Sequence, residues 1–291
     1  MKAGMCFWCF NQMLLDGDID VLGVMEFVGR QTEADRIEPL SRYWDESRDE
    51  NEQAREARDL LDEVGLEVSC YTLDSDFAVY DEAKSRECIE ECIARLETTQ
   101  ILGADTIRLD PRTSLPGPAE EADLDEVTER VARGMQEITD AAAEVGITVG
   151  VENHGTLLGS SDTIARIVEL VDRPNFGVNI DFTNFRNAFG EDHVEATRKL
   201  AERVVHAHAK DFYISAEPQE GEEWHETARG EWVKRAVGGE GDAQWPELFT
   251  ILRDAGYDGT ISLEVSDPAD IKGSVAQGVA NLRRIIAQIE A

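Results

Sequence analysis

Short apolar runs alternate with amphipathic stretches along almost the whole chain. The apolar runs are short enough to be buried strands. They predict strands at residues 2–8, 20–28, 66–73, 105–110, 146–152, 175–181, 203–208 and 259–264. Between most of these runs, apolar residues recur at the spacing of a helix with one buried face. This spacing predicts helices at residues 48–64, 81–102, 122–145, 161–171, 191–202, 245–255 and 271–289.

This order of elements favours one α/β architecture. A helix between two strands crosses back over the sheet, so strand–helix units in succession imply parallel strands. Eight such units close into a barrel that typically needs about 250 residues, and the chain has 291. An open doubly wound sheet is the alternative, but it usually carries a glycine-rich turn after its first strand, and residues 6–13 have none. We predict a single (β/α)8 barrel domain over residues 1–291, with an outer helix ring and a polar insertion at about 214–241 after the seventh strand.

The net charge of −33, from 61 acidic and 28 basic residues, narrows the possible partners. Such a surface repels nucleic acid and anionic membranes, so we expect neither as a partner. Because the acidic residues are spread over the helices and lysine is scarce, we predict a cytoplasmic, halophilic protein that is unstable in low salt. An ordinary acidic protein is the alternative. No apolar run approaches the roughly 18 residues that span a bilayer, and we expect no signal peptide.

Five cysteines scattered over a large domain argue against a disulfide scaffold. Cys6 and Cys9 form a C-x-x-C in the first predicted strand, without a second pair at zinc-ribbon spacing. Cys88 and Cys92 lie one turn apart on a predicted helix. We therefore expect buried thiols.

The last four predicted strands each end on a side chain that can bind a metal: Glu152, Asp181, His208 and Glu264. Alone, each acidic residue could be solvated surface. In a barrel, however, the carboxyl ends of the strands converge on one mouth, which carries the active site. Three carboxylates and an imidazole form a donor set for a divalent metal, whose Lewis acidity suits an oxygen-rich substrate. His208 is preferred to His206 as the ligand because it lies nearer the strand end.

Other polar residues near these strand ends are candidate substrate contacts. His154 follows the fifth strand and could line the pocket, whereas His193 opens a predicted helix and is interpreted as a surface residue. Lys210 and Arg235 could contact substrate oxygens or a phosphate, or could simply balance local negative charge.

Several segments resemble the xylose isomerase-like barrels, in particular sugar and sugar-phosphate isomerases and epimerases similar to D-tagatose 3-epimerase. The resemblance runs over nearly the whole chain. Its most specific segments are VENHG (151–155), NIDFTN (179–184), HAHAKD (206–211) and residues 237–265. It implies one divalent cation, with Mn²⁺ preferred and Mg²⁺, Co²⁺ or Zn²⁺ as alternatives. The implied ligands are Glu152, Asp181, His208 and Glu264.

The resemblance also implies a reaction on a sugar, a sugar phosphate or a related polyhydroxy ketone. A metal-stabilised enediolate forms when a proton leaves the carbon beside the carbonyl. Glu152 and Glu264 would exchange protons with the two faces of the substrate. The family usually has a histidine shortly after the strand-six aspartate, where this chain has Asn184, which can bind a hydroxyl but cannot shuttle a proton. We expect an isomerase or epimerase, with a dimer or tetramer possible.

Three other functions are alternatives to an isomerase or epimerase, and the sequence fits them to different degrees. A dehydratase of the inosose or dehydroshikimate type begins with the same proton abstraction and then expels a hydroxyl. An endonuclease IV-type enzyme needs three metals and additional histidines, and the second to fourth predicted strands contain none. A non-catalytic sugar-binding barrel predicts an incomplete ligand set, whereas all four candidates are present.

Overall fold

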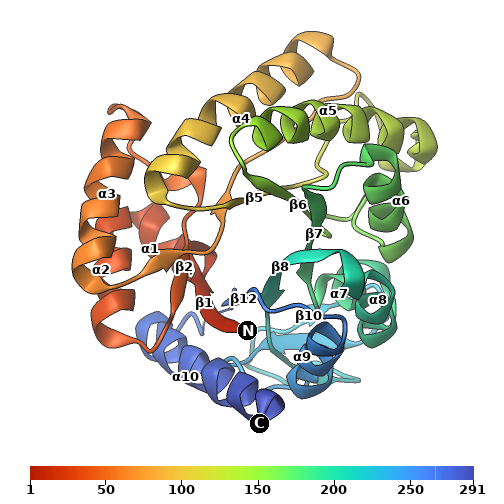
Figure 1. Cartoon of the computed structure of the whole chain (residues 1–291). Helices are drawn as coiled ribbons and strands as arrows, with labels where there is room; N and C mark the ends of the chain where they lie inside the picture. The colour runs from red at the N-terminus through yellow and green to blue at the C-terminus, as the bar shows by residue number, and fades with distance from the viewer. Residues whose placement is uncertain (266) are drawn as a thin grey trace.

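The computed structural model describes residues 1–265 and 267–291 as a parallel barrel ringed by helices (Figure 1). The strand order is β3-β2-β1-β12-β8-β7-β6-β5-β4, and each neighbouring pair is parallel. The barrel strands are β1 (Lys2–Cys6), β2 (Arg36–Glu38), β3 (Glu67–Val68), β4 (Tyr71–Thr72), β5 (Thr106–Leu109), β6 (Thr148–Glu152), β7 (Phe176–Asp181), β8 (Val204–Ala209) and β12 (Thr260–Leu263).

The barrel closes through its third strand. Residues 66–73, predicted as one strand, form two short pieces, β3 and β4, which occupy opposite ends of the strand order. β3 pairs with β2, and a further parallel bridge joins Leu40 to Thr72. Counting the two pieces as one strand gives the eight of a (β/α)8 barrel, so the predicted fold class is confirmed.

The outer helices begin and end on local sequence signals. The Asp49, Asp81 and Asp123 carboxylates accept backbone N–H groups at the starts of α3, α4 and α5. Gly65 and Gly103 end α3 and α4 in the left-handed conformation. The helices are α1 (Asn11–Asp16), α2 (Val21–Gln31), α3 (Glu50–Val64), α4 (Glu82–Leu102), α5 (Leu124–Glu144), α6 (Ser161–Val171), α7 (Asn184–Phe189), α8 (His193–Leu200), α9 (Trp245–Asp254) and α10 (Ile271–Glu290).

One continuous cluster of buried apolar side chains joins residues of the strands and of the helices around them. Among the helices in the described part of the chain, none is both long and apolar enough to cross a bilayer.

The prediction of a second strand at residues 20–28 is wrong. These residues form most of α2, which begins where the Asp20 carboxylate accepts the N–H of Gly23. Val21, Val24 and Val28 are buried at helical spacing. The true second strand, β2, is only three residues long, too short to produce a strong periodic signal.

Two predicted side-chain environments are also corrected. His193, interpreted as a surface residue, is buried at the start of α8. Cys9 lies in a short 3-10 helix (Phe7–Phe10) rather than in the first strand. The structure joins none of the five cysteines in a disulfide; four of them are buried and Cys88 is half-buried.

The region predicted as a polar insertion contains a small antiparallel sheet. Its strands are β9 (Phe212–Ser215), β10 (His225–Glu226) and β11 (Trp232–Arg235), in the order β10-β11-β9. This sheet follows β8 directly and therefore stands at the carboxyl end of the barrel.

Asp211 ties the two ends of this region together. Its buried carboxylate accepts four backbone N–H groups at 2.8–3.1 Å, from Phe212, Gly239, Gly241 and Ala243. The small sheet is thus held beside the strand ends that carry the candidate ligands.

Candidate metal centre and substrate pocket

The structure brings together the four predicted ligands at the carboxyl ends of β6, β7, β8 and β12. Glu152 and Asp181 close β6 and β7, His208 lies near the end of β8, and Glu264 directly follows β12. One donor atom of each lies within 4.8 Å of the others. Three of the side chains are 0–1% exposed, and Glu264 is 8% exposed.

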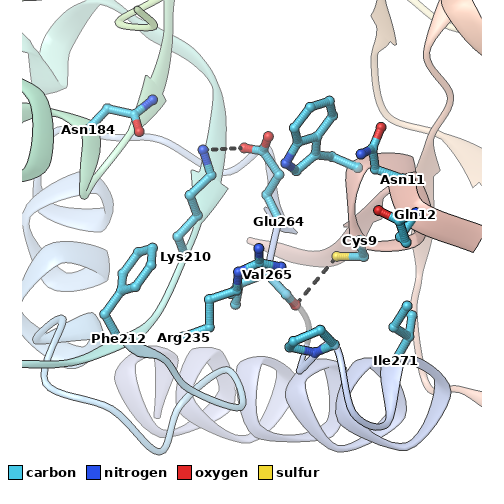
Figure 2. A pocket seen from close by; sticks show the side chains of 12 residues that line it. Cys9, Asn11, Gln12, Asn184, Lys210, Phe212, Arg235, Glu264, Val265 and Ile271 are labelled. Carbon is cyan, nitrogen blue, oxygen red and sulfur yellow. Dashed lines mark hydrogen bonds and ion pairs between the residues drawn. The ribbon is translucent and has the colours of Figure 1, made fainter. Parts of the chain in front are cut away.

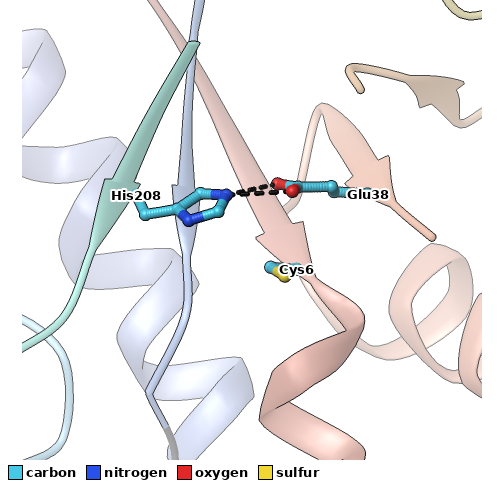
Figure 3. A group of neighbouring side chains, drawn as sticks. All are labelled: Cys6, Glu38 and His208. Carbon is cyan, nitrogen blue, oxygen red and sulfur yellow. Dashed lines mark hydrogen bonds and ion pairs between the residues drawn. The ribbon is translucent and has the colours of Figure 1, made fainter. Parts of the chain in front are cut away.

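The imidazole of His208 presents a different nitrogen to each side. Its Nδ1 lies 2.8 Å from Glu264 Oε2 and 3.2 Å from Glu152 Oε1. Its Nε2 lies 2.9 Å from Glu38 (Figure 3). Burial lowers the pKa of His208, but the carboxylates of Glu38 and Glu264 outweigh burial and raise this pKa to about 10. By these distances, Nδ1 is the ring nitrogen on the side of the candidate ligands.

The two oxygens of Asp181 have separate environments. Oδ1 accepts the N–H of Thr183 at 2.9 Å, the N–H of Asn184 at 3.0 Å and the Thr183 hydroxyl at 3.1 Å. Oδ2 lies 2.8 Å from Lys210 Nζ. The turn after β7 thus fixes one oxygen and leaves the other facing the centre.

Lys210 stands between two of the carboxylates. Its Nζ is also 3.4 Å from Glu264 Oε2. Burial lowers the pKa of Lys210, but the Asp181 and Glu264 carboxylates outweigh burial, so the pKa is raised and the ammonium persists. Conversely, burial raises the pKa of Glu264, and Lys210 and His208 lower it by more.

Glu152 is held by an arginine on the neighbouring strand. Arg108, on β5, forms ion pairs with Glu152 and with Asp110, the latter at 2.8 Å. His154 places its Nδ1 3.0 Å from Asp110 Oδ1 and has a side chain that is 50% exposed. His154 thus lies on the Asp110 side of the centre.

A cavity of about 300 Å³ opens beside Glu264. Asn184, Lys210 and Arg235, three predicted substrate contacts, line it, together with Asn11 from the N-terminal segment (Figure 2). Figure 2 shows Lys210 reaching the Glu264 carboxylate across one wall. Hydrogen-bonding groups therefore surround a volume suited to a small polar molecule.

The donor set fits one divalent cation. Three buried carboxylates and an imidazole nitrogen within 4.8 Å of one another match the oxygen and nitrogen ligands of Mn²⁺, Co²⁺ and Zn²⁺. The residues that would hold the cation are Glu152, Asp181, Glu264 and His208 through Nδ1. A cation here would offset buried negative charge that Lys210 and Arg108 offset only in part.

Three polar residues of this region were missed by the sequence analysis: Glu38, Arg108 and Asp110. Arg108 and Asp110 alternate with apolar residues in the predicted fourth strand, so charged side chains on one face of a buried strand were an available signal. Glu38 had no such signal, because its strand was assigned to the wrong residues.

The family model for xylose isomerase-like TIM barrels matches residues 26–285 of this sequence. The chain belongs to this family. The chain is 28% identical over 150 residues to an inosose dehydratase of Lacticaseibacillus casei. That match covers 50% of this chain and 49% of the relative, so the chain spans about half the length of the curated relatives it matches.

Solved structures match over nearly the whole barrel. A zinc-bound IolI protein aligns with a TM-score of 0.77 at 16% identity, covering 99% of each chain. A D-psicose 3-epimerase of Clostridium cellulolyticum H10 aligns with a TM-score of 0.76 at 16% identity, covering 98% of this chain and 99% of the epimerase. At these identities the structural matches establish the fold alone.

Proposed function

We propose that this barrel is a metal-dependent enzyme that removes a proton beside the carbonyl of a small polyhydroxy compound. The observation that carries this proposal is the buried four-donor group adjoining a polar cavity of about 300 Å³. A bound divalent cation would supply Lewis acidity toward the carbonyl oxygen.

Glu264 is the better placed of the two predicted proton carriers. Among the four candidate ligands, it lines the cavity, whereas the others lie deeper. Glu152, by contrast, is 0% exposed and is ion-paired with Arg108. We assign the abstraction of the proton to Glu264, and we assign Glu152 chiefly to binding the cation.

Lys210 provides a second proton carrier at the same cavity. Glu264 would take the proton from the carbon beside the carbonyl, and Lys210 Nζ would protonate the hydroxyl on the next carbon. The carbon–oxygen bond then breaks, a carbon–carbon double bond forms, and water leaves. We therefore place a dehydratase first, which the inosose dehydratase relatives also support.

An isomerase or epimerase is the second candidate function. The two carboxylates it requires, Glu152 and Glu264, both belong to the four-donor group. In this reaction the proton returns to carbon, and no carbon–oxygen bond breaks.

Substrate contacts follow from the cavity lining. Asn184 can hydrogen-bond a hydroxyl, and Arg235 can bind an oxygen or a phosphate. His154 lies beside Asp110, so it would contact only a substrate that extends from the cavity toward Asp110.

The discriminating experiment is turnover of keto-inositols and ketoses in D₂O, followed by NMR. Loss of water that disappears in Lys210→Gln supports the dehydratase. An epimer or isomer carrying deuterium, still formed by Lys210→Gln, supports the second candidate instead. A metal-loaded protein that exchanges no substrate proton for deuterium would refute both and favour a sugar-binding barrel.

A further inference from the structure

Glu38 is a fully buried carboxylate that the proposed chemistry does not use. It ends β2 and faces His208 on β8 across the barrel interior (Figure 3). Its oxygens lie 2.9 and 3.1 Å from Nε2 of His208 and 2.9 Å from Nε2 of His206. The hydroxyl of Thr72 donates to it at 2.7 Å. Every one of these contacts suits an ionised carboxylate, which can only accept hydrogen bonds.

This arrangement dictates which nitrogen of His208 can bind a metal. An imidazole that binds a metal is neutral and has one N–H and one lone pair. Because Glu38 accepts, the proton belongs on Nε2 and the lone pair on Nδ1. Nδ1 is the nitrogen that faces Glu152 and Glu264, and the amide nitrogen of Asn179, a donor, also lies 3.3 Å from it.

A separate metal site around Glu38 is the competing interpretation. Donor atoms of Cys6, Glu38 and His208, and likewise of Glu38, Cys70 and His206, lie within 4.8 Å of one another. However, the Nε2 atoms of both imidazoles are already engaged with the carboxylate. Burial raises the pKa of both thiols well above its usual value, so neither offers the thiolate that a metal prefers.

We propose that Glu38 is a positioning residue, which orients His208 so that the Nδ1 lone pair points at the metal centre. The inference rests on the metal centre proposed above. His206 and Thr72 hold the same carboxylate and so restrict its rotation. Outer carboxylates of this kind typically change metal affinity by about 10- to 100-fold.

The test is the Zn²⁺ dissociation constant, measured by competition with a chelating dye. Glu38→Gln keeps the size of the side chain, but it removes the charge and replaces one of the two acceptor oxygens by an NH₂ group, which cannot accept from an imidazole N–H. We expect Zn²⁺ binding to weaken by about 10- to 100-fold. Thr72→Val is the matched control, because it removes one contact to Glu38 and leaves both histidine contacts. We expect its dissociation constant to stay close to that of the wild type.

A second measurement does not depend on the variant folding. In ¹⁵N NMR of the zinc-loaded wild type, we expect His208 to carry its proton on Nε2 and the metal on Nδ1. Metal on Nε2, wild-type affinity in Glu38→Gln, or an equal loss in Thr72→Val would each overturn the role of Glu38. A wild-type protein that binds no metal would instead refute the centre itself.

Discussion

Replacing Asp181 by asparagine tests the metal centre with little disturbance of the fold. Oδ1 accepts three hydrogen bonds from the turn after β7, and an asparagine oxygen can keep all three. Oδ2, which faces Lys210 and the other ligands, becomes an NH₂ group without a lone pair for a metal. The substitution thus keeps the turn and removes one candidate ligand atom, together with the ion pair between Asp181 and Lys210.

The expected magnitude follows from the linkage between binding and folding. At a metal concentration 100 times the dissociation constant, binding stabilises the wild type by about 2.7 kcal/mol. For a chain of this size, that corresponds to a rise in Tm of roughly 5–10 °C. If Asp181→Asn weakens binding about 100-fold, the same metal concentration gives only about 0.4 kcal/mol and a shift of roughly 1 °C.

The assay is thermal unfolding of chelator-stripped protein with and without Mn²⁺, Mg²⁺, Co²⁺ or Zn²⁺. Asp211→Asn is the matched control, since Asp211 is another buried aspartate at this end of the barrel but binds only backbone N–H groups. It should lower the Tm of the metal-free protein and leave the metal-induced shift intact. A full shift in Asp181→Asn, or no shift in the wild type with any of the four cations, would refute the reasoning.

Three further predictions concern stability. Asp211→Ala leaves four backbone N–H groups without their acceptor and should lower the free energy of unfolding by about 3–5 kcal/mol in urea titrations; a loss below about 1 kcal/mol would contradict this. Burial and, to a lesser extent, Arg186 lower the pKa of His193, so the unfolded chain binds the proton more tightly and stability should fall as the pH drops below about 6.5. Urea midpoints at several pH values should show this fall in the wild type and a smaller one in His193→Gln. The net charge of −33 predicts that the urea midpoint of unfolding rises when KCl is increased from ~0.1 M to ~1 M, because the Debye length shrinks from about 10 to about 3 Å and the repulsion between acidic side chains is screened. An unchanged urea midpoint would argue against halophilic adaptation.

The sequence alone was sufficient for the architecture and for the positions of the candidate ligands. Strand and helix periodicity are local, and in a parallel barrel every strand must end at the same mouth. A polar residue closing an apolar strand is therefore placed in space by its position in sequence. This is why the strand pattern was enough to predict that Glu152, Asp181, His208 and Glu264 converge.

Tertiary structure decided the remaining secondary structure and the side-chain contacts of the site, because local sequence patterns do not specify which distant residues meet. Residues 20–28 are apolar enough for a strand or a helix, and packing, including that of α2 against α3, distinguishes the two. The contact of Glu38 with His208 joins residues 170 positions apart, and that of Arg108 with Glu152 joins residues 44 apart. The sequence by itself thus placed the four candidate ligands at the mouth of the barrel. The closed barrel decided how each is paired, oriented and charged, because these properties arise from contacts across its interior.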